Sequence, residues 1–307
     1  MRSKKQTGHL TALITIGIWG TTFISTKILL KEFQPVEILF FRFVMGYAVL
    51  LAACPGRMKK VSIRQELTFA AAGFCGVCLY YLLENIALTY TMASNVGVIT
   101  STAPFFTAIL SQLSAKSKEK LRAEFFAGFA IAMAGILMVS LNGSRVSLNP
   151  AGDFLAVSAA FVWGCYSVLS KKITSFDYPV ILTVRRTFFY GILFMIPPLF
   201  FFDFEMELSR FTDAVYLLNI IYLGAGASAL CFVTWNYAVK VLGAVRTSVY
   251  IYLVPVITII ASVLILKESV TWISAVGVVL TIAGLFLSEY TPKGRTEIKN
   301  RIVKQEE

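Results

Sequence analysis

Three ionisable side chains, Lys27, Arg42 and Glu84, interrupt long apolar stretches of this chain. An ionisable group at the centre of a bilayer costs about 2.5–3.5 kcal/mol or more, so its presence there needs a reason. At a helical rise of about 1.5 Å per residue the three fall at a similar depth, where Glu84 could neutralise one cation. We expect them, together with Asn85, to close one mouth of a pathway through the membrane. The alternative is a structural ion pair that only holds helices together.

The carboxyl group of Glu84 could also bind a coupling proton. Burial favours the neutral carboxyl and a nearby cation favours the carboxylate, so the sequence leaves this coupling open. If Glu84 governs transport, its replacement by glutamine changes uptake or efflux kinetics while protein level and folding stay normal.

Aromatic residues are the candidates for the walls of a binding cavity. Trp19 and Trp163 lie near the middle of their apolar stretches, and Tyr166 follows Trp163 on the same helix face. Small-molecule pockets combine apolar walls with a few placed polar groups. The alternative is that such rings pack between helices or face lipid. The predicted cavity residues are Trp19, Tyr80, Tyr81, Asn95, Trp163, Tyr166 and Trp235.

Two prolines, Pro104 and Pro255, occupy matching places in two apolar stretches. Each removes a backbone hydrogen bond and bends its helix. Paired interruptions of this kind mark moving or substrate-lining helices in transporters, so we expect hinges at both; a static kink is the alternative.

The composition predicts that these residues lie on membrane-spanning helices. Hydrophobic residues make up 57% of the 307 residues, charged residues only 15%, and the mean hydropathy is +0.74. Soluble domains have about 25% charged residues. A span needs about 20 apolar residues. Ten candidates meet this requirement: Leu10–Leu30, Pro35–Cys54, Leu67–Thr89, Ala93–Leu113, Leu121–Leu141, Gly152–Lys172, Tyr178–Phe201, Ala214–Ala238, Ala244–Leu266 and Val270–Glu289.

The basic residues of the connections predict the orientation. Of the 28 Lys and Arg residues, 20 fall on one side of the ten spans and 4 on the other. Cytoplasmic connections carry the excess of basic residues, so both termini are expected in the cytoplasm and the protein in the cell membrane. This explains the net charge of +11 without a nucleic-acid partner.

The two halves of the chain resemble each other. WGTTFISTK from Trp19 aligns with WGCYSVLSK from Trp163, an offset of 144 that also places Arg42 on Arg186. Later the offset is 151, which places Pro104 on Pro255. Each half holds five spans, an odd number, so the second copy enters the membrane inverted. We expect an all-α membrane protein with repeats at residues 1–145 and 146–307, the second with a cytoplasmic tail.

The inversion predicts a second cluster at the opposite mouth. Arg186 matches Arg42, and Asn236 matches Asn85, so both are expected to serve that mouth. Trp235 stands where the first repeat has Glu84, and the carboxylate is therefore missing from the copy.

The sequence resembles the drug/metabolite transporter superfamily, specifically its ten-helix EamA-type members. The matching segments are WGTTFISTK, LTYTMASNVGVITSTAPFFTAILS, GDFLAVSAAFVWG and VPVITIIASVLILKE, and the resemblance covers nearly the whole chain. It implies a ten-helix basket around a central cavity and transport of metabolites.

Taken together, we expect a secondary transporter of small metabolites such as amino acids or related compounds, working by alternating access as an exporter. A facilitative uniporter or exchanger is the alternative within transport; a membrane scaffold or membrane-embedded enzyme is the alternative outside it. Enzyme chemistry would need a nucleophile–base pair or metal ligands, and the one histidine, His9, lies in the amino-terminal segment. We expect no catalytic residue, metal or cofactor; the oligomeric state is open.

Overall fold

The computed structural model describes residues 2–58, 61–114, 123–140, 149–202, 204–267 and 269–289. Most of these residues are helical, and none of them forms a strand. Seven helical stretches are long and apolar enough to cross a membrane, and three shorter apolar helices bring the described total to ten. The long stretches are Lys4–Leu29, Pro35–Ala53, Ile63–Tyr90, Ala93–Leu113, Pro150–Thr174, Val180–Phe201 and Ala214–Leu242, and the shorter ones Ala123–Met138, Tyr250–Leu266 and Trp272–Gly284.

Several spans are built from consecutive helical segments. The first half comprises α1 (Arg2–Leu29), α2 (Pro35–Ala53), α3 (Ile63–Gly73), the π-helix η1 (Phe74–Leu79), α4 (Tyr80–Tyr90), α5 (Ala93–Thr100), α6 (Ala103–Ser114) and α7 (Ala123–Ser140). The second comprises α8 (Pro150–Thr174), α9 (Val180–Phe201), the 3₁₀-helix η2 (Leu208–Thr212), α10 (Ala214–Ile221), the π-helix η3 (Tyr222–Leu230), α11 (Cys231–Leu242), α12 (Ala244–Ser248), the 3₁₀-helix η4 (Val249–Leu253), α13 (Val254–Ala261), the π-helix η5 (Ser262–Leu266) and α14 (Trp272–Glu289).

Helix starts follow local capping chemistry. Gln34 and Glu37 form a capping box at α2, whose first residue is a proline. Ser62 and Gln65 form the same box at α3. This box starts the third span at Ile63, four residues before the predicted Leu67, because capping satisfies the polar first turn outside the apolar core.

The ten predicted spans are confirmed as helices, and the fourth and ninth are interrupted near the two prolines. The fourth breaks between α5 and α6, and the ninth passes through η4 before α13. The breaks fall just before Pro104 and Pro255, where a continuous helix would need the missing N–H groups. The predicted repeat boundary at 145, the basic residues within 115–122 and the tail from 290 lie outside the described residues.

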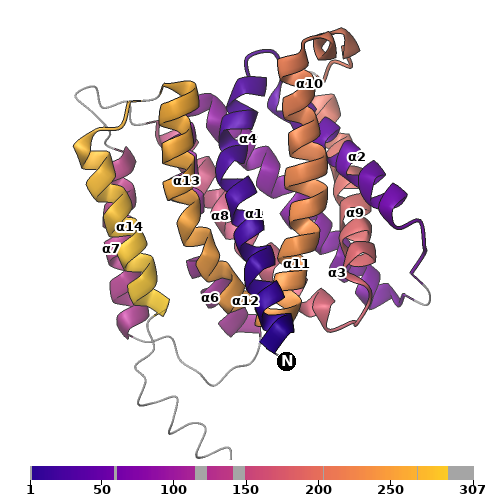
Figure 1. Cartoon of the computed structure of the whole chain (residues 1–307), viewed down its shortest axis with the longest axis horizontal. Coiled ribbons are helices and arrows are strands. Elements are labelled where there is room, and N and C mark those ends of the chain that lie inside the picture. Colours follow the sequence, from indigo (N-terminus) through magenta and orange to yellow (C-terminus); the bar gives the residue numbers. More distant parts are fainter. Residues whose placement is uncertain are drawn as a thin grey trace, which may run out of the picture.

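Figure 1 shows that the two halves have opposite directions. The third span of the first half starts low with α3 and ends high with α4, whereas its counterpart starts high with α10 and ends low with α11. The halves also interlock: a Cβ atom at Gly20 of α1 would lie 2.5 Å from Ile257 of α13, and one at Gly164 of α8 would lie 2.8 Å from Phe106 of α6. Each first span therefore packs against the fourth span of the other half.

The fifth spans, α7 and α14, pack against each other at one end of the molecule (Figure 1). A Cβ atom at Gly135 would lie 2.5 Å from the Gly277 carbonyl oxygen, and one at Gly284 would lie 2.5 Å from the Gly128 carbonyl oxygen. Both contacts are with backbone, which cannot rotate away, so the glycines allow the close approach of the two helices.

Replacing Gly135 with alanine is expected to destabilise the protein by about 1–3 kcal/mol, because the helices must separate to admit the methyl group. Thermal unfolding in detergent should show a midpoint several degrees lower. Gly17→Ala is the control, because no atom lies within 4 Å of its added Cβ. Equal midpoints for the two variants would contradict this account of the interface.

Candidate functional site

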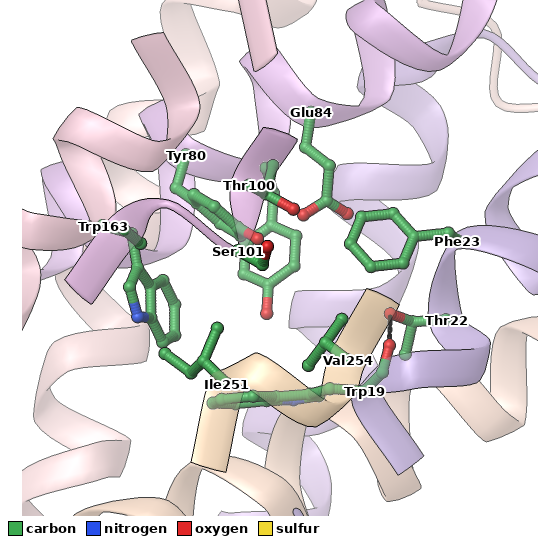
Figure 2. A pocket seen from close by; sticks show the side chains of 12 residues that line it. Trp19, Thr22, Phe23, Tyr80, Glu84, Thr100, Ser101, Trp163, Ile251 and Val254 are labelled. Atoms are coloured by element: carbon green, nitrogen blue, oxygen red, sulfur yellow. Dashed lines mark hydrogen bonds between the residues drawn. The ribbon is translucent and has the colours of Figure 1, made fainter. Parts of the chain in front are cut away.

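A central cavity lies where the two halves meet, and about 460 Å³ of its space, counted to the open mouth, is not filled by atoms. Figure 2 shows side chains from both halves pointing into it. The first half contributes Trp19, Thr22, Phe23, Tyr80, Tyr81, Glu84, Thr100, Ser101 and Ala103, and the second contributes Trp163, Ile251 and Val254.

The inverted repeat supplies matched walls. Trp19 and Trp163, equivalent at the offset of 144, meet edge to face with ring centroids 5.2 Å apart. At the offset of 151, Thr100 matches Ile251, another residue of the lining. The same offset pairs Ala103 with Val254. Equivalent positions of the two repeats therefore line the same cavity.

The two helix breaks form part of this wall. Ser101 lies in the turn between α5 and α6, and its hydroxyl donates to the Val98 carbonyl at 2.6 Å. Thr100 donates to the Val96 carbonyl at 2.7 Å. These bonds satisfy carbonyl groups near the break, so the chain can leave the helix beside the cavity.

Glu84 is the ionisable acid of the described lining. Its side chain comes from α4, the residue is only 1% exposed, and Oε1 has no hydrogen-bond partner among the described residues. The carboxyl group lies beside the Tyr80 hydroxyl, and Figure 2 shows it facing Thr100. No lysine, arginine or histidine appears among the lining residues that the structure describes.

Of the predicted cavity residues, Trp19, Tyr80, Tyr81 and Trp163 line the cavity, and the other three are not part of the lining. Trp235 packs on Trp19 at 5.1 Å, and Tyr166 packs on Trp163 at 5.0 Å. Asn95 is turned to the Thr91 hydroxyl, to which it donates at 3.1 Å.

Sequence reasoning missed the hydroxyl-bearing and aliphatic parts of the lining. Thr22 and Phe23 follow Trp19 by one helical turn and so share its helix face, which means that the prediction of Trp19 could have been extended to them. The others directly precede the two prolines. The missed residues are Thr22, Phe23, Thr100, Ser101, Ala103, Ile251 and Val254.

Lys27, Arg42 and Glu84 do not form the expected charged trio. The Lys27 ammonium donates to the Leu88 carbonyl and, at 2.9 Å, to the Thr91 carbonyl. No ion pair joins Glu84 to either cation in the described part of the chain. The expectation used depth alone, whereas an ion pair also needs direct contact; Arg42 acts on the Glu84 carboxyl through its charge without such a contact.

Arg42 is fully buried between α2 and η3. Its guanidinium lies 4.2 Å from the centroid of the Tyr81 ring, and Nε donates to the Ser228 hydroxyl at 3.1 Å. Both terminal nitrogens lack a hydrogen-bond partner within the described residues. Since Tyr81 lines the cavity and Arg42 does not, the arginine forms a layer behind the ring.

Arg186 is not clustered with Asn236. It forms an ion pair with Glu66 of α3, with Nε 3.0 Å from Oε2, and the Tyr190 hydroxyl donates to the same carboxylate at 2.7 Å. The sequence predicted no acid beside Arg186, because Trp235 stands at the position that matches Glu84. The structure shows that the first repeat supplies this acid, Glu66.

Asn236 instead holds a buried network in the second half. Ser170 donates to its Oδ1, and its Nδ2 donates to the Tyr166 hydroxyl at 3.0 Å. The equivalent residues of the first half, Thr26 and Asn85, are not joined in this way: Thr26 Oγ1 and Asn85 Oδ1 are both buried without a partner among the described atoms. The two repeats therefore differ at matched positions.

The amide of Asn85 has a different partner from that of its counterpart. Its Nδ2 donates to the Pro35 carbonyl at the start of α2, at 3.0 Å. Predicted site residues Asn85 and Asn236 are thus both buried, but only Asn236 joins the first and third spans of its own half.

A surface cluster that the sequence did not single out lies at the start of α2. Arg210 donates to Glu37 and Glu205 at 2.9 Å each, and to Glu207 at the same distance. Glu37 is fully buried. The Arg210 guanidinium lowers the pKa of Glu207 through their hydrogen bond, so the cluster fixes the segment before α10.

Comparison with known proteins agrees with the fold. The EamA-like transporter family matches residues 6–141 and again 150–290. A transporter of Archaeoglobus fulgidus is 29% identical over 286 residues, covering 91% of this chain and 96% of its own. A protein of Escherichia coli named "Probable amino-acid metabolite efflux pump" is 25% identical, covering 94% and 96%.

Another relative and a solved structure are also similar to this chain. A protein of Streptantibioticus cattleyicolor named "Probable terminal-alkyne amino-acid exporter" is 24% identical over 92% of this chain and 93% of its own. A solved crystal structure superposes with a TM-score of 0.65 at 19% identity, covering 92% of this chain and 96% of that chain, which shows a shared fold. The chain belongs to the EamA-like transporter family and is a membrane transporter of small metabolites rather than an enzyme.

Proposed function

We propose that the protein is a secondary exporter of amino-acid-related metabolites, which works by alternating access in the cell membrane with both termini in the cytoplasm and its repeats divided at residue 145. The observation that carries the proposal is the cavity between the repeats, with one buried carboxyl group and matched walls from both halves. The names of two relatives support the substrate class and the direction. The excess of basic residues on one side supports the orientation.

The cavity suits a molecule of amino-acid size. Its walls are mainly rings and aliphatic groups, and its polar groups are a carboxyl and several hydroxyls. Such a site takes up apolar side chains without selecting strongly among them, while the few polar groups fix one end of the substrate.

Glu84 is the group through which we propose that a proton drives transport. Tyr80 and Tyr81 lie beside it on α4, Arg42 lies behind Tyr81 on α2, and Lys27 is the basic residue in the last turn of α1. A carboxylate that gives up its proton on one side of the membrane and regains it on the other couples the two fluxes.

The hydrogen bonds at matched positions differ between the two repeats, and this difference supports a particular pair of alternating conformations. In the described conformation, Asn236 is bonded to Ser170 and Tyr166, while Thr26 and Asn85 are unjoined. We propose that alternation reverses this: Thr26 bonds to Asn85, the network at Asn236 opens, and the helix breaks at Pro104 and Pro255 act as hinges. Two copies of one fold make the two states similar in energy.

Purified protein in sealed vesicles tests this function. Vesicles loaded with labelled L-amino acids should lose label faster when a pH gradient is imposed than when it is absent. Equal rates with and without the gradient would point to facilitated diffusion or exchange. No movement of any amino acid above empty vesicles would reject the proposed substrate class.

A further inference from the structure

We infer that the cavity recognises the ammonium group of its substrate, held between Glu84 and the aromatic walls, and that the ligand class is a small organic amine in which a carboxylate is not required. The inference deepens the proposed function, because it rests on the same cavity. It goes further in naming the charge that the site selects and the residue that selects it.

The first support is an uncompensated acid. Glu84 is almost completely buried, and its Oε1 meets no hydrogen-bond donor in the described part of the chain. Neither nearby cation forms an ion pair with it in the described part of the chain: Arg42 lies behind the Tyr81 ring with Nε on Ser228 and acts on Glu84 only through its charge, and Lys27 is bound to backbone carbonyls. A buried carboxylate without an ion-pair partner favours a ligand that brings the positive charge.

The second support is the direction of the hydroxyl groups. Thr22, Thr100 and Ser101 all line the cavity, and each donates its proton to a backbone carbonyl three or four residues earlier, at 2.8, 2.7 and 2.6 Å. A hydroxyl whose proton is used in this way presents lone pairs, so it can only accept. The wall beside Glu84 is therefore rich in acceptors, which suits the three N–H donors of an ammonium group.

The third support is the arrangement of rings. The Tyr80 ring lies 4.8 Å from Trp163 and 4.7 Å from Tyr81, and Trp163 meets Trp19 edge to face. Ring faces attract a cation within about 6 Å of the centroid. A cage of tilted rings around an acid stabilises an ammonium group and repels a carboxylate.

An anionic ligand finds fewer partners. The indole nitrogen of Trp19 already donates to the Ala227 carbonyl at 3.0 Å. Figure 2 shows the indole nitrogen of Trp163 on the edge of its ring turned away from the centre of the cavity. The tyrosine hydroxyls can donate or accept and so do not decide between the charges.

Tryptophan fluorescence of the purified protein tests the inference directly. Two of its four tryptophans line the cavity, and a third packs against one of them. The probes share one ring and differ in charge: 2-phenylethylamine is a cation, 2-phenylethanol is neutral and 3-phenylpropionate is an anion. The amine should quench saturably with at least tenfold higher affinity than the other two.

The variants assign the preference to one residue. Glu84→Gln should weaken amine binding at least tenfold and leave 2-phenylethanol binding unchanged, which also shows that the variant is folded. Glu66→Gln removes a carboxylate from the same span, where it is paired with Arg186, and should keep the amine preference.

The inference is overturned if the anion binds as tightly as the amine, if the amine does not bind saturably at millimolar concentration, or if Glu84→Gln keeps the preference. Binding of the amine without transport of any amino acid would reject the proposed function and leave this inference standing. Transport of amino acids by a protein that shows no preference for the amine would reject this inference and leave the proposed function standing.

Discussion

Glu84→Gln is expected to remove the stimulation of transport by a pH gradient. Glutamine keeps the size and shape of the side chain but cannot bind or release a proton in this range. If the carboxyl of Glu84 carries the coupling proton, the ratio of the efflux rate with the gradient to the rate without it falls to one. The wild-type ratio should be clearly above one, because a gradient of one pH unit adds a driving force of about 1.4 kcal/mol per proton.

The measurement uses sealed vesicles at saturating substrate, so that a weaker affinity of the variant does not imitate a loss of coupling. Glu66→Gln is the matched control, because it neutralises an acid of the same span that is held by Arg186 and Tyr190 outside the cavity. A Glu84→Gln protein that is still stimulated by the gradient would exclude this residue as the coupling site.

The fold could be predicted from the sequence because several independent sequence patterns point to the same arrangement of spans. Apolar length sets the spans, the odd number of spans in each repeat sets their inversion, and the alignment of Trp19 with Trp163 places both rings at the cavity. Each signal is a property of many residues or of the repeat as a whole, so local errors do not change the result.

The partners of charged side chains could not be predicted in the same way. Depth along a helix gives one coordinate, whereas an ion pair also depends on helix rotation and on which spans are neighbours. Lys27 and Glu84 share a depth but not a partner, and Glu66 reaches Arg186 from the other half. The hydroxyl wall was missed for a related reason: Ser101 is placed by a helix break whose geometry a span prediction does not contain.

The inverted repeat also shows where two similar halves must differ. In the alternating access that we propose, the two gates are never open together, so matched positions with different hydrogen bonds are the candidates for the parts that change. The contrast between Asn236 and Asn85 is such a pair, since one is joined to the first span of its half and the other is not.

Asn236→Leu is expected to open the cavity toward the face of the membrane where the N terminus lies. Ser170 and Asn236 lie between the cavity and that face, because α8 runs from Pro150 past Trp163 to Thr174. Leucine keeps the branched shape of the side chain but leaves Ser170 and the Tyr166 hydroxyl without this partner, at roughly 2–3 kcal/mol in the described conformation. The population open to that face should rise roughly 30- to 150-fold.

The rate at which a thiol reagent reaches the cavity measures this population. In a protein whose five cysteines are replaced by alanine, Ser101→Cys places one thiol in the lining. A membrane-impermeant reagent on the N-terminal face should label this thiol faster in Asn236→Leu. Thr26→Val should slow the same labelling, since it removes a bond formed only in the opposite conformation and relieves a buried unpaired hydroxyl in this one. Labelling that changes in the same direction in both variants would show that the two networks do not exchange.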